Sequence, residues 1–352
     1  SSSAASDVYK RQPLSGKTTI FNAITGAAAE TSAYAGGGKL NLAEVKVPDE
    51  RLTILARIFH PRKVVPASIL VKEIGVEVTE KGVIAPAAVA QLRNCNALVC
   101  VIRAFLDPTL PPSGSDGPRE DFNRLLDALI WSDYEVTERR LERLQKEGKR
   151  ATREAVLLEG VSKKLSEGEL IGVNAFDKQD EKLVSGFCFL TAKPLIVCAT
   201  LGEESLPTDP LRERAGQLGL PFLEIRGDLE MEIARLDPAE QAEFLQDLGV
   251  TEPAVNRFVT TIYRHLNLIS FLTAGEDEVR AWSILEGTPA AEAAGKIHTD
   301  LEKGFIRAEV VPWRELADSG GFHEAKKQNL IRLEGKDYPV KDGDVLTIRF
   351  NI

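Results

Sequence analysis

The chain has 352 residues, which is enough for two or three domains, and hydrophobic residues make up 43% of it, so a sizeable core is expected. Its formal net charge of −9 argues against nucleic-acid binding over the whole surface, so any contact with RNA or a ribosome must use a local basic patch. No apolar run reaches about 18 residues, the length typical of a membrane-spanning helix, and we expect no membrane contact.

Residues 1–12 do not have the pattern of a buried strand, although a phosphate-binding loop normally follows one. Val8 and Tyr9 are their only larger apolar side chains, and they lack the apolar core of a secretory signal. We therefore expect that a tag, linker or assembly remnant has replaced the native start. Reading the source gene upstream tests this expectation.

A phosphate-binding loop of the pattern G-x-x-x-x-G-K-[ST] is indicated by the next stretch, whose residues are Pro13, Leu14, Ser15, Gly16, Lys17, Thr18 and Thr19. Gly16 allows a tight turn, Lys17 would reach the phosphates, and Thr18 would ligate Mg²⁺. A helix is predicted over 19–25, with its positive N-terminal end toward the same phosphates. Arg11 stands where the pattern has its first glycine, and its side chain narrows the space for phosphate. The alternative is a chance turn and helix cap.

Beyond this helix, strands and helices alternate, which predicts an α/β fold with a parallel sheet that binds ligands at the carboxyl ends of its strands. A segment of small residues at 27–38, rich in glycine, is interpreted either as a nucleotide-sensing switch or as a plain connection. The predicted elements are strands over 42–47, 67–71, 96–103, 193–200 and 221–225, and a helix over 50–59.

The composition changes at residues 121–164, where leucines recur at helical spacing among many charged residues. This pattern predicts an antiparallel pair of long helices inserted into the α/β domain. Their basic residues alternate with acids, which is typical of a solvated face, and a contact surface for RNA or the ribosome is the functional alternative. These basic residues are Arg139, Arg140, Arg143, Lys146, Lys149, Arg150 and Arg153.

The C-terminal part is predicted to form a small mixed sheet that carries one main helix. Helices over 237–249, capped by Asp237, and over 252–266 precede it. Strands are predicted over 268–273, 279–284, 305–311, 330–333 and 345–350, with a helix over 289–297 and a tight turn at 342–344.

The four cysteines, Cys95, Cys100, Cys188 and Cys198, form no C-x-x-C pair, and no histidine stands at ligand spacing from them. We expect buried free thiols in a cytoplasmic protein and no zinc site.

Several stretches of the C-terminal part form longer motifs, which read Leu268 to Gly275, Val279 to Trp282, Ala293 to His298, Asp300 to Glu309 and Leu333 to Tyr338. They resemble the C-terminal TGS domain of the YchF-type Obg-like ATPases. Other parts of the chain are similar to the same family. They are the phosphate loop, Val47 to Asp49 with Arg51 and Leu52, Val101 to Phe105, the helical insertion and Glu230 to Leu236. The resemblance extends from Pro13 to Ile352.

This resemblance implies three domains: a P-loop G domain over 13–120 and 181–266, a coiled-coil-like helical insertion over 121–180, and a ubiquitin-like TGS domain over 267–352. It implies a translation-factor-class NTPase that uses Mg²⁺, hydrolyses ATP in preference to GTP, and associates with ribosomes. Lys17 and Thr18 match the family's catalytic positions for the phosphates and the metal.

The family's D-x-x-G element, whose Asp holds Mg²⁺ through water, matches only in part. Gly75 aligns with its glycine, but Lys72 stands at the Asp position. Glu73 is expected to point to the other face of a strand and to be a poor substitute. Lys72 either weakens the metal site or contacts the γ-phosphate as a second cation.

Two other nucleotide-binding elements also depart from the family. The base-reading N-x-x-E element aligns with Thr200, Leu201, Gly202 and Glu203, where the Glu matches and the Asn does not. The switch threonine expected before Asn41 is absent.

Two functions remain open. The first is an ATPase whose nucleotide state controls ribosome association, with turnover weakened by Lys72 and Arg11. The second is a ribosome- or RNA-binding protein with a degenerate nucleotide site, which uses the insertion and a basic patch of Lys296, Lys303, Arg307, Lys326 and Lys327. We favour the enzyme because Lys17 and Thr18 persist. We expect a monomer and no recognition of DNA sequence.

Overall fold

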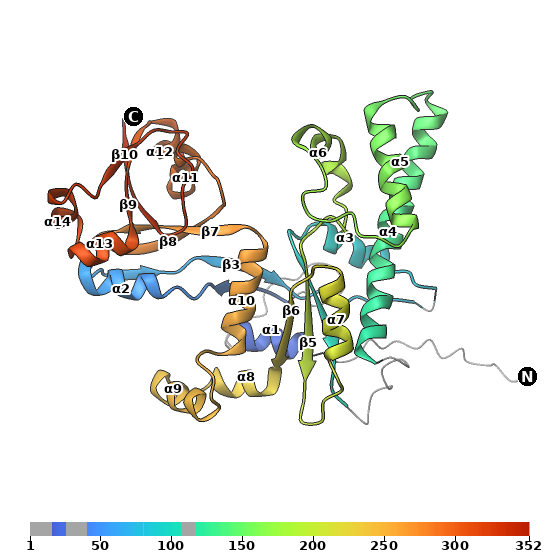
Figure 1. The fold of residues 1–352 in the computed structure, drawn as a ribbon, viewed down its shortest axis with the longest axis horizontal. Coiled ribbons are helices and arrows are strands. Elements are labelled where there is room, and N and C mark those ends of the chain that lie inside the picture. Colours follow the sequence, from blue (N-terminus) through green and yellow to red (C-terminus); the bar gives the residue numbers. More distant parts are fainter. Residues whose placement is uncertain (1–15, 26–40, 80, 107–116, 352) are drawn as a thin grey trace, which may run out of the picture. The chain divides into compact units, whose positions relative to one another are not determined.

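The structure is a computed structural model that describes residues 16–25, 41–79, 81–106 and 117–351 (Figure 1). The chain forms two compact units. We call Ser1–Leu42 with Lys72–Val255 the N-terminal unit, and Ala43–Val71 with Asn256–Ile352 the C-terminal unit. Residues 1–15, including Arg11 and the first part of the predicted phosphate loop, and the Gly-rich segment at 27–38 lie outside the described residues.

The N-terminal unit contains a parallel sheet in the order β4-β5-β6. β4 (Leu98–Arg103) and β6 (Phe222–Arg226) flank β5 (Leu195–Leu201). Residues 195–200 of β5 are all buried, as its near-continuous apolar run predicts for a central strand covered on both faces. The predicted α/β class with a parallel sheet is confirmed.

Eight helices of this unit are described: α1 (Lys17–Thr25), α3 (Pro86–Arg93), α4 (Pro118–Lys146), α5 (Arg153–Ser166), α6 (Lys178–Val184), α7 (Asp209–Gln217), α8 (Gly227–Ile233) and α9 (Pro238–Asp247). A 3₁₀ turn, η1 (Ser185–Phe187), follows α6. No ranges were predicted for α3, α6, α7 and α8, which have nine residues or fewer and show no clear helical period in the sequence. Asp237 caps α9 in a capping box with Glu240, which confirms the predicted cap.

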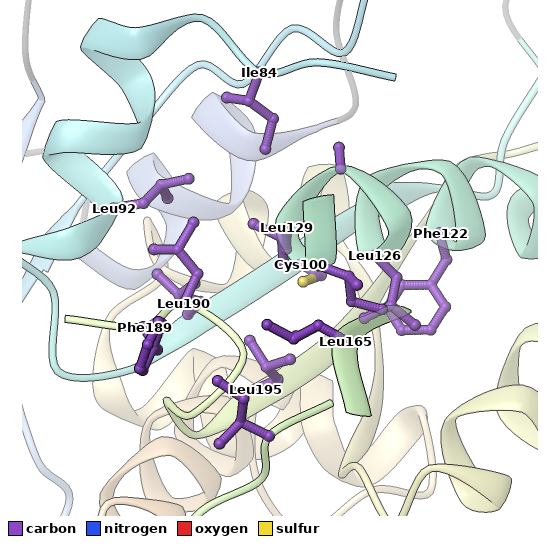
Figure 2. Packing of buried hydrophobic residues seen from close by; sticks show 14 of the residues in the cluster. Ile84, Leu92, Cys100, Phe122, Leu126, Leu129, Leu165, Phe189, Leu190 and Leu195 are labelled. Atoms are coloured by element: carbon purple, nitrogen blue, oxygen red, sulfur yellow. The ribbon is translucent and has the colours of Figure 1, made fainter. Parts of the chain in front are cut away.

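One hydrophobic cluster extends from the sheet into the predicted pair of long helices, α4 and α5 (Figure 2). Phe122, Leu126 and Leu129 line the first part of α4 and pack with Cys100 of β4 and Leu195 of β5. Leu144 near the far end of α4 and all four buried residues of α5 belong to the same cluster. Residues 121–180, predicted as an inserted domain, therefore share their core with the sheet.

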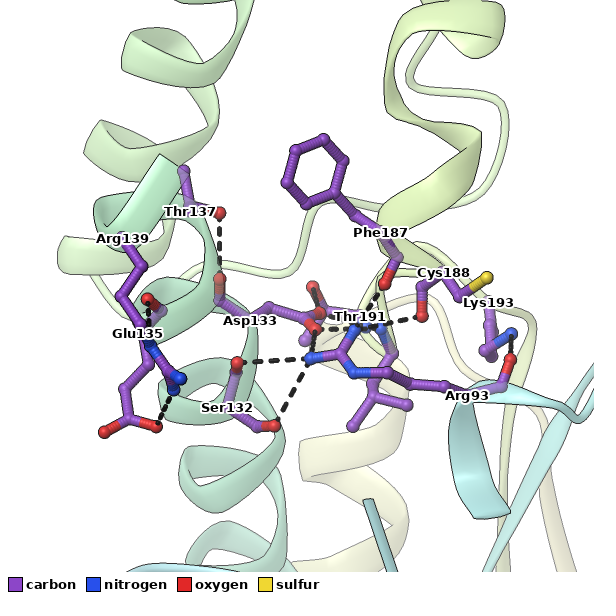
Figure 3. A network of polar contacts seen from close by, with 11 residues as sticks. Arg93, Ser132, Asp133, Glu135, Thr137, Arg139, Phe187, Cys188, Thr191 and Lys193 are labelled. Carbon is purple, nitrogen blue, oxygen red and sulfur yellow. Dashed lines mark hydrogen bonds and ion pairs between the residues drawn. The ribbon is translucent and has the colours of Figure 1, made fainter. Parts of the chain in front are cut away.

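A buried carboxylate fixes α4 to the segment that precedes β5 (Figure 3). Asp133 accepts hydrogen bonds from the N–H of Leu190 at 3.1 Å and from the N–H and hydroxyl of Thr191 at 2.8 and 2.9 Å. The Arg93 guanidinium lies 3.2 Å from it. Burial raises the pKa of Asp133, and these partners oppose that shift. Because both carboxylate oxygens are satisfied inside the fold, we interpret the network as structural.

Four of the seven basic residues predicted on the helical pair make ion pairs with acids. Arg140 makes two hydrogen bonds to Glu154, at 2.7 and 2.8 Å, and Arg139 lies 3.1 Å from Glu135. Lys149 pairs with Glu147, and Arg153 pairs with Asp177 and Asp180. These contacts favour the solvated, mixed-charge face over a basic patch along this part of the pair.

Cys95, Cys100, Cys188 and Cys198 are free thiols, as predicted, but not all are buried. Cys100 and Cys198 are buried, and burial raises the pKa of each to about 12. The expectation is wrong for Cys188, which is exposed at the left-handed residue (φ 48°) that ends η1.

The C-terminal unit is built on a mixed sheet in the order β10-β9-β11-β7-β8-β2. Its strands are β2 (Lys63–Val65), β7 (Leu268–Ala274), β8 (Glu278–Leu285), β9 (Phe305–Pro312), β10 (Arg332–Glu334) and β11 (Asp344–Phe350). The main helix α11 (Ala290–Ile297) buries Ala290 and Ala293 in one cluster with Phe271, Val310 and Leu346. The predicted mixed sheet with one main helix is confirmed.

The remaining helices of this unit are α10 (Ala254–His265), whose first residues lie in the N-terminal unit, α12 (Thr299–Lys303), α13 (Trp313–Ser319) and α14 (Phe322–Lys327). Across both units, no helix among the described residues combines the length and apolarity needed to cross a membrane.

Residues 43–71 join the C-terminal unit, which differs from the predicted domain boundaries. They hold α2 (Glu50–Phe59), β2 and most of the paired strands β1 (Leu42–Lys46) and β3 (Ser68–Lys72). β2 extends the sheet by pairing in parallel with β8, and the ring of Phe59 in α2 packs against that of Phe322 in a tilted arrangement, with ring centroids 5.3 Å apart. We predicted that 43–71 and 256–266 belong to the same domain as the phosphate loop. Because of these long-range contacts they group with the C-terminal unit instead.

An ion-pair cluster fastens α2 within this unit. Arg51 lies 2.7 Å from Asp49, the N-cap of α2, and 2.8 Å from Asp342. The other oxygen of Asp342 accepts the N–H of Ser270 in β7 at 2.9 Å. The Asp49 side chain is only 6% exposed, so it depends on Arg51 for compensation of its charge.

Arg51→Ala should lower the free energy of unfolding of the C-terminal unit by about 2 kcal/mol, because it leaves a buried carboxylate unpaired. Arg62→Ala is the matched control, since the Arg62–Asp277 pair is 86% and 90% exposed and should contribute less than about 0.5 kcal/mol. Urea unfolding with amide exchange of α2 and β2 measures both. Equal effects of the two substitutions would contradict this account.

Candidate phosphate-binding site

The predicted phosphate turn begins α1 at the carboxyl end of β5. Gly16 has φ +76°, the left-handed region that favours glycine. A Cβ on Gly16 would lie 2.8 Å from Thr200 Cγ2, so the turn also needs glycine for close packing. Gly16 is thus required by the backbone conformation and by the neighbouring strand.

The helix that follows is anchored on its other side by α8. Ile20, Phe21, Ala23 and Ile24 of α1 are buried. A Cβ on Gly227, the first residue of α8, would lie 2.8 Å from Thr19 Cγ2. Thr19 therefore contacts α8, and this contact fixes the first turn of α1, where the helix dipole is positive and an anion is favoured.

Lys17 and Thr18 stand together at this N-terminus. Burial lowers the pKa of Lys17, and the negative charge of Glu73 opposes that shift. The exposed Thr18 hydroxyl donates a hydrogen bond to Glu73 Oε1 at 2.6 Å. A cation, a hydroxyl and a carboxylate therefore meet where the helix dipole is positive.

Glu73 corrects one expectation from the sequence. It was expected to point away from the phosphate loop, but it contacts Thr18. β3 ends at Lys72, so the strand alternation used for that expectation does not extend to residue 73. Asn41 fixes Glu73 instead: its Nδ2 donates to Glu73 Oε2 at 2.7 Å, and its carbonyl accepts the Glu73 N–H at 2.9 Å. The sequence did contain a signal for this contact, because Glu73 is a carboxylate one residue after the position where the aspartate was expected.

The other predicted nucleotide-binding residues differ in burial and in their distance along the chain from the phosphate turn. Thr200 is 2% exposed, and its hydroxyl donates a hydrogen bond to the Ile102 carbonyl at 3.2 Å. Its side chain therefore supports the turn by packing against Gly16. Leu201 ends β5, and Glu203 is exposed in the loop beyond it. Gly75 is exposed, and no atom lies within 4 Å of where its Cβ would be. Pro13, Leu14 and Ser15 lie outside the described residues.

This arrangement suits a phosphate anion and a hard cation bound together. Mg²⁺ prefers oxygen ligands, keeps several waters, and commonly binds to one or two protein groups plus substrate phosphates. The Thr18 hydroxyl and the Glu73 carboxylate are ligands of this kind. Within the described ranges no group of three His, Cys, Asp or Glu forms a metal cage, so these residues fit a metal that arrives with a polyphosphate.

Comparisons with known proteins show the family to which the chain belongs. A ribosome-binding ATPase YchF from Haemophilus ducreyi is 37% identical over 359 residues, covering 97% of each chain, and one from Bacillus subtilis is 36% identical over 357 residues. The chain belongs to the YchF family. Residues 268–351 match the family model YchF-GTPase_C, described as a protein of unknown function (DUF933).

A solved structure extends this family relationship to the whole fold. The YchF GTPase of Schizosaccharomyces pombe superposes with a TM-score of 0.83 at 27% identity, covering 95% of this chain and 94% of that one. The resemblance found in the sequence is therefore confirmed in both units.

Gly16→Ala should destabilise the N-terminal unit by about 2 kcal/mol, because it combines a left-handed alanine with a clash against Thr200. Gly75→Ala should change stability by less than about 0.5 kcal/mol, since its Cβ has open space. Adding Thr200→Ala to Gly16→Ala should restore the part of the stability that is lost to the clash, but not the part that is lost to backbone strain. Urea unfolding measures all three, and equal costs for the two glycines would contradict the packing argument.

Proposed function

We propose that this YchF family member is a Mg²⁺-dependent ATPase of the P-loop class, whose nucleotide state regulates its association with the ribosome in the cytoplasm. The observation that carries this proposal is the convergence of Gly16, Lys17 and Thr18 at the start of α1 with the Glu73 carboxylate. The names of the curated relatives, ribosome-binding ATPases, support the same function. We propose that it acts as a monomer.

Each residue of the turn has a separate part in holding the nucleotide. The N-terminal N–H groups of α1 would donate hydrogen bonds to phosphate oxygens, and Gly16 would let those oxygens approach closely. Lys17 would place its ammonium against the β- and γ-phosphates, and Thr18 would hold the metal through its hydroxyl. When bound, Mg²⁺ neutralises charge that develops on the transferring phosphoryl group.

The preference for ATP over GTP and a slow turnover are parts of the proposal. Glu203 is exposed beyond β5, where it is free to meet a base, whereas Thr200 is buried and replaces the family's asparagine. Lys72 places a cation next to Glu73 in the chain, which disfavours a second positive charge from the metal. Arg11, where the phosphate loop has a glycine, acts in the same direction. We therefore propose weak but specific hydrolysis.

Lys17→Ala should weaken binding of ATP about 10- to 100-fold, because a charge-assisted contact to phosphate is lost. Lys46→Ala is the matched control, since Lys46 is an exposed lysine of β1. Calorimetry with ATP and GTP in the presence of Mg²⁺ measures both variants and the base preference. No binding of either nucleotide by the unaltered chain would reject the proposed function.

Ribosome association should differ between the ATP-bound and ADP-bound states. Cosedimentation with ribosomes in a non-hydrolysable ATP analogue, in ADP, and without nucleotide measures this difference. Lys17→Ala should remove the difference while keeping the nucleotide-free level of binding, because it affects the phosphate site alone. Equal binding of the unaltered chain in all three states would instead favour a nucleotide-independent binding protein.

A further inference from the structure

The carboxylate of Glu73 is held in a defined orientation at the start of α1. One oxygen accepts the Thr18 hydroxyl at 2.6 Å, and the other accepts the Asn41 amide at 2.7 Å. The backbone N–H of Glu73 also donates to the Asn41 carbonyl at 2.9 Å. Three hydrogen bonds therefore fix both the backbone and the side chain of residue 73.

The direction of the Thr18 hydrogen bond decides what this pair can bind. Thr18 uses its proton toward Glu73, so its oxygen lone pairs face away from the carboxylate and remain available to a cation. A carboxylate beside a metal-ligating hydroxyl can accept hydrogen bonds from metal-bound waters. Mg²⁺ keeps several such waters when it binds with phosphates.

The surrounding charges favour this use of the carboxylate. Lys17 would be directed to phosphate, and its charge interacts with Glu73. The side chain of Lys72, the preceding residue, makes no hydrogen bond or ion pair within the described part of the chain, whereas Glu73 makes three hydrogen bonds. The negative charge nearest the Thr18 hydroxyl is therefore that of Glu73.

We infer that Glu73 is the residue that orients the water shell of the bound Mg²⁺ ion, with Asn41 holding its carboxylate toward Thr18. The inference rests on the proposed function, because the metal arrives with the nucleotide. Lys72 stands where the family has an aspartate, and a lysine cannot accept hydrogen bonds from metal-bound water. The inference assigns that role to Glu73. Glu73 acts through the metal-bound water and is a positioning residue.

The side chain of glutamate has the required length. Its backbone is tied to Asn41, so the carboxylate must span the remaining distance to Thr18 through two methylene groups. Aspartate at position 73 would withdraw the carboxylate by about one carbon–carbon bond, roughly 1.5 Å, which is enough to break a 2.6 Å hydrogen bond.

The test compares ATP affinity with saturating Mg²⁺ and with EDTA, by calorimetry on the full chain. Glu73→Gln should lower affinity in Mg²⁺ about tenfold, the usual effect of removing a group that orients a metal ligand. In EDTA it should leave affinity unchanged or raise it, because a negative charge near the phosphates is gone. Glu77→Gln, at an exposed glutamate of the same segment, is the matched control and should change neither value.

Two further variants keep the test independent of one substitution. Glu73→Asp should show the same loss in Mg²⁺, and Asn41→Ala a smaller one of about threefold, because the carboxylate keeps its charge but loses its orientation. The affinity of Mn²⁺ for the complex with a non-hydrolysable ATP analogue, followed by electron paramagnetic resonance, should fall in the same order. A fall in both Mg²⁺ and EDTA would indicate a purely structural role and overturn the inference.

The outcomes separate this inference from the proposed function. If Mg²⁺ raises the ATP affinity of the unaltered chain and of Glu73→Gln by the same factor, the inference is wrong and the proposed function stands. If the unaltered chain binds no ATP under either condition, both are wrong. If Mg²⁺ strengthens binding in the unaltered chain but not in Glu73→Gln, both are supported.

Discussion

The close approach between the start of α1 and the end of β5 is the constraint on which the phosphate site depends. Gly16 and Thr200 leave no room for a Cβ between them. Thr200 is itself hydrogen-bonded to Ile102 of β4, so the turn rests on two adjacent strands of a buried sheet. Because the turn is supported in this way, the positions of Lys17 and Thr18 after it are fixed by the packing of Gly16.

A second constraint lies in the path of the chain between residues 41 and 73. The segment 43–71 belongs to the C-terminal unit, where β2 pairs with β8 and Arg51 bridges Asp49 and Asp342. The chain leaves the N-terminal unit after Leu42 and returns to it at Lys72, and the adjacent residues Asn41 and Glu73 are hydrogen-bonded to each other. The carboxylate beside Thr18 is therefore held by a pair of residues within the N-terminal unit that flank the excursion of the chain through 43–71.

The sequence predicted the elements whose signals are long and local. The apolar run of β5, the leucine spacing of α4 and α5 and the capping residue of α9 each identify an element without tertiary information. β2 spans three residues and is a strand only because β8 lies beside it, so no local pattern predicts it. The grouping of 43–71 with the C-terminal residues fails for the same reason, since it depends on long-range pairing.

The candidate site shows the same division between local and long-range information. Gly16, Lys17 and Thr18 follow from a short motif with a defined geometry. Thr200 was expected to meet the nucleotide, but its burial against Gly16 gives it a supporting position that no motif encodes. Glu73 was missed because strand alternation was carried one residue too far, past the end of β3 at Lys72.

The proposed role of Glu73 depends on the position of its carboxylate oxygen atoms and not on its residue number. Alignment by residue number finds a lysine where the family has an aspartate and scores the carboxylate as lost. The structure places a carboxylate oxygen 2.6 Å from the Thr18 hydroxyl from the next residue along, because glutamate has an additional methylene and Asn41 turns it toward the helix. A cation with flexible water ligands requires a correctly placed oxygen and tolerates a change in the residue that supplies it. The departure at Lys72 therefore changes the charge around the site without removing the acceptor.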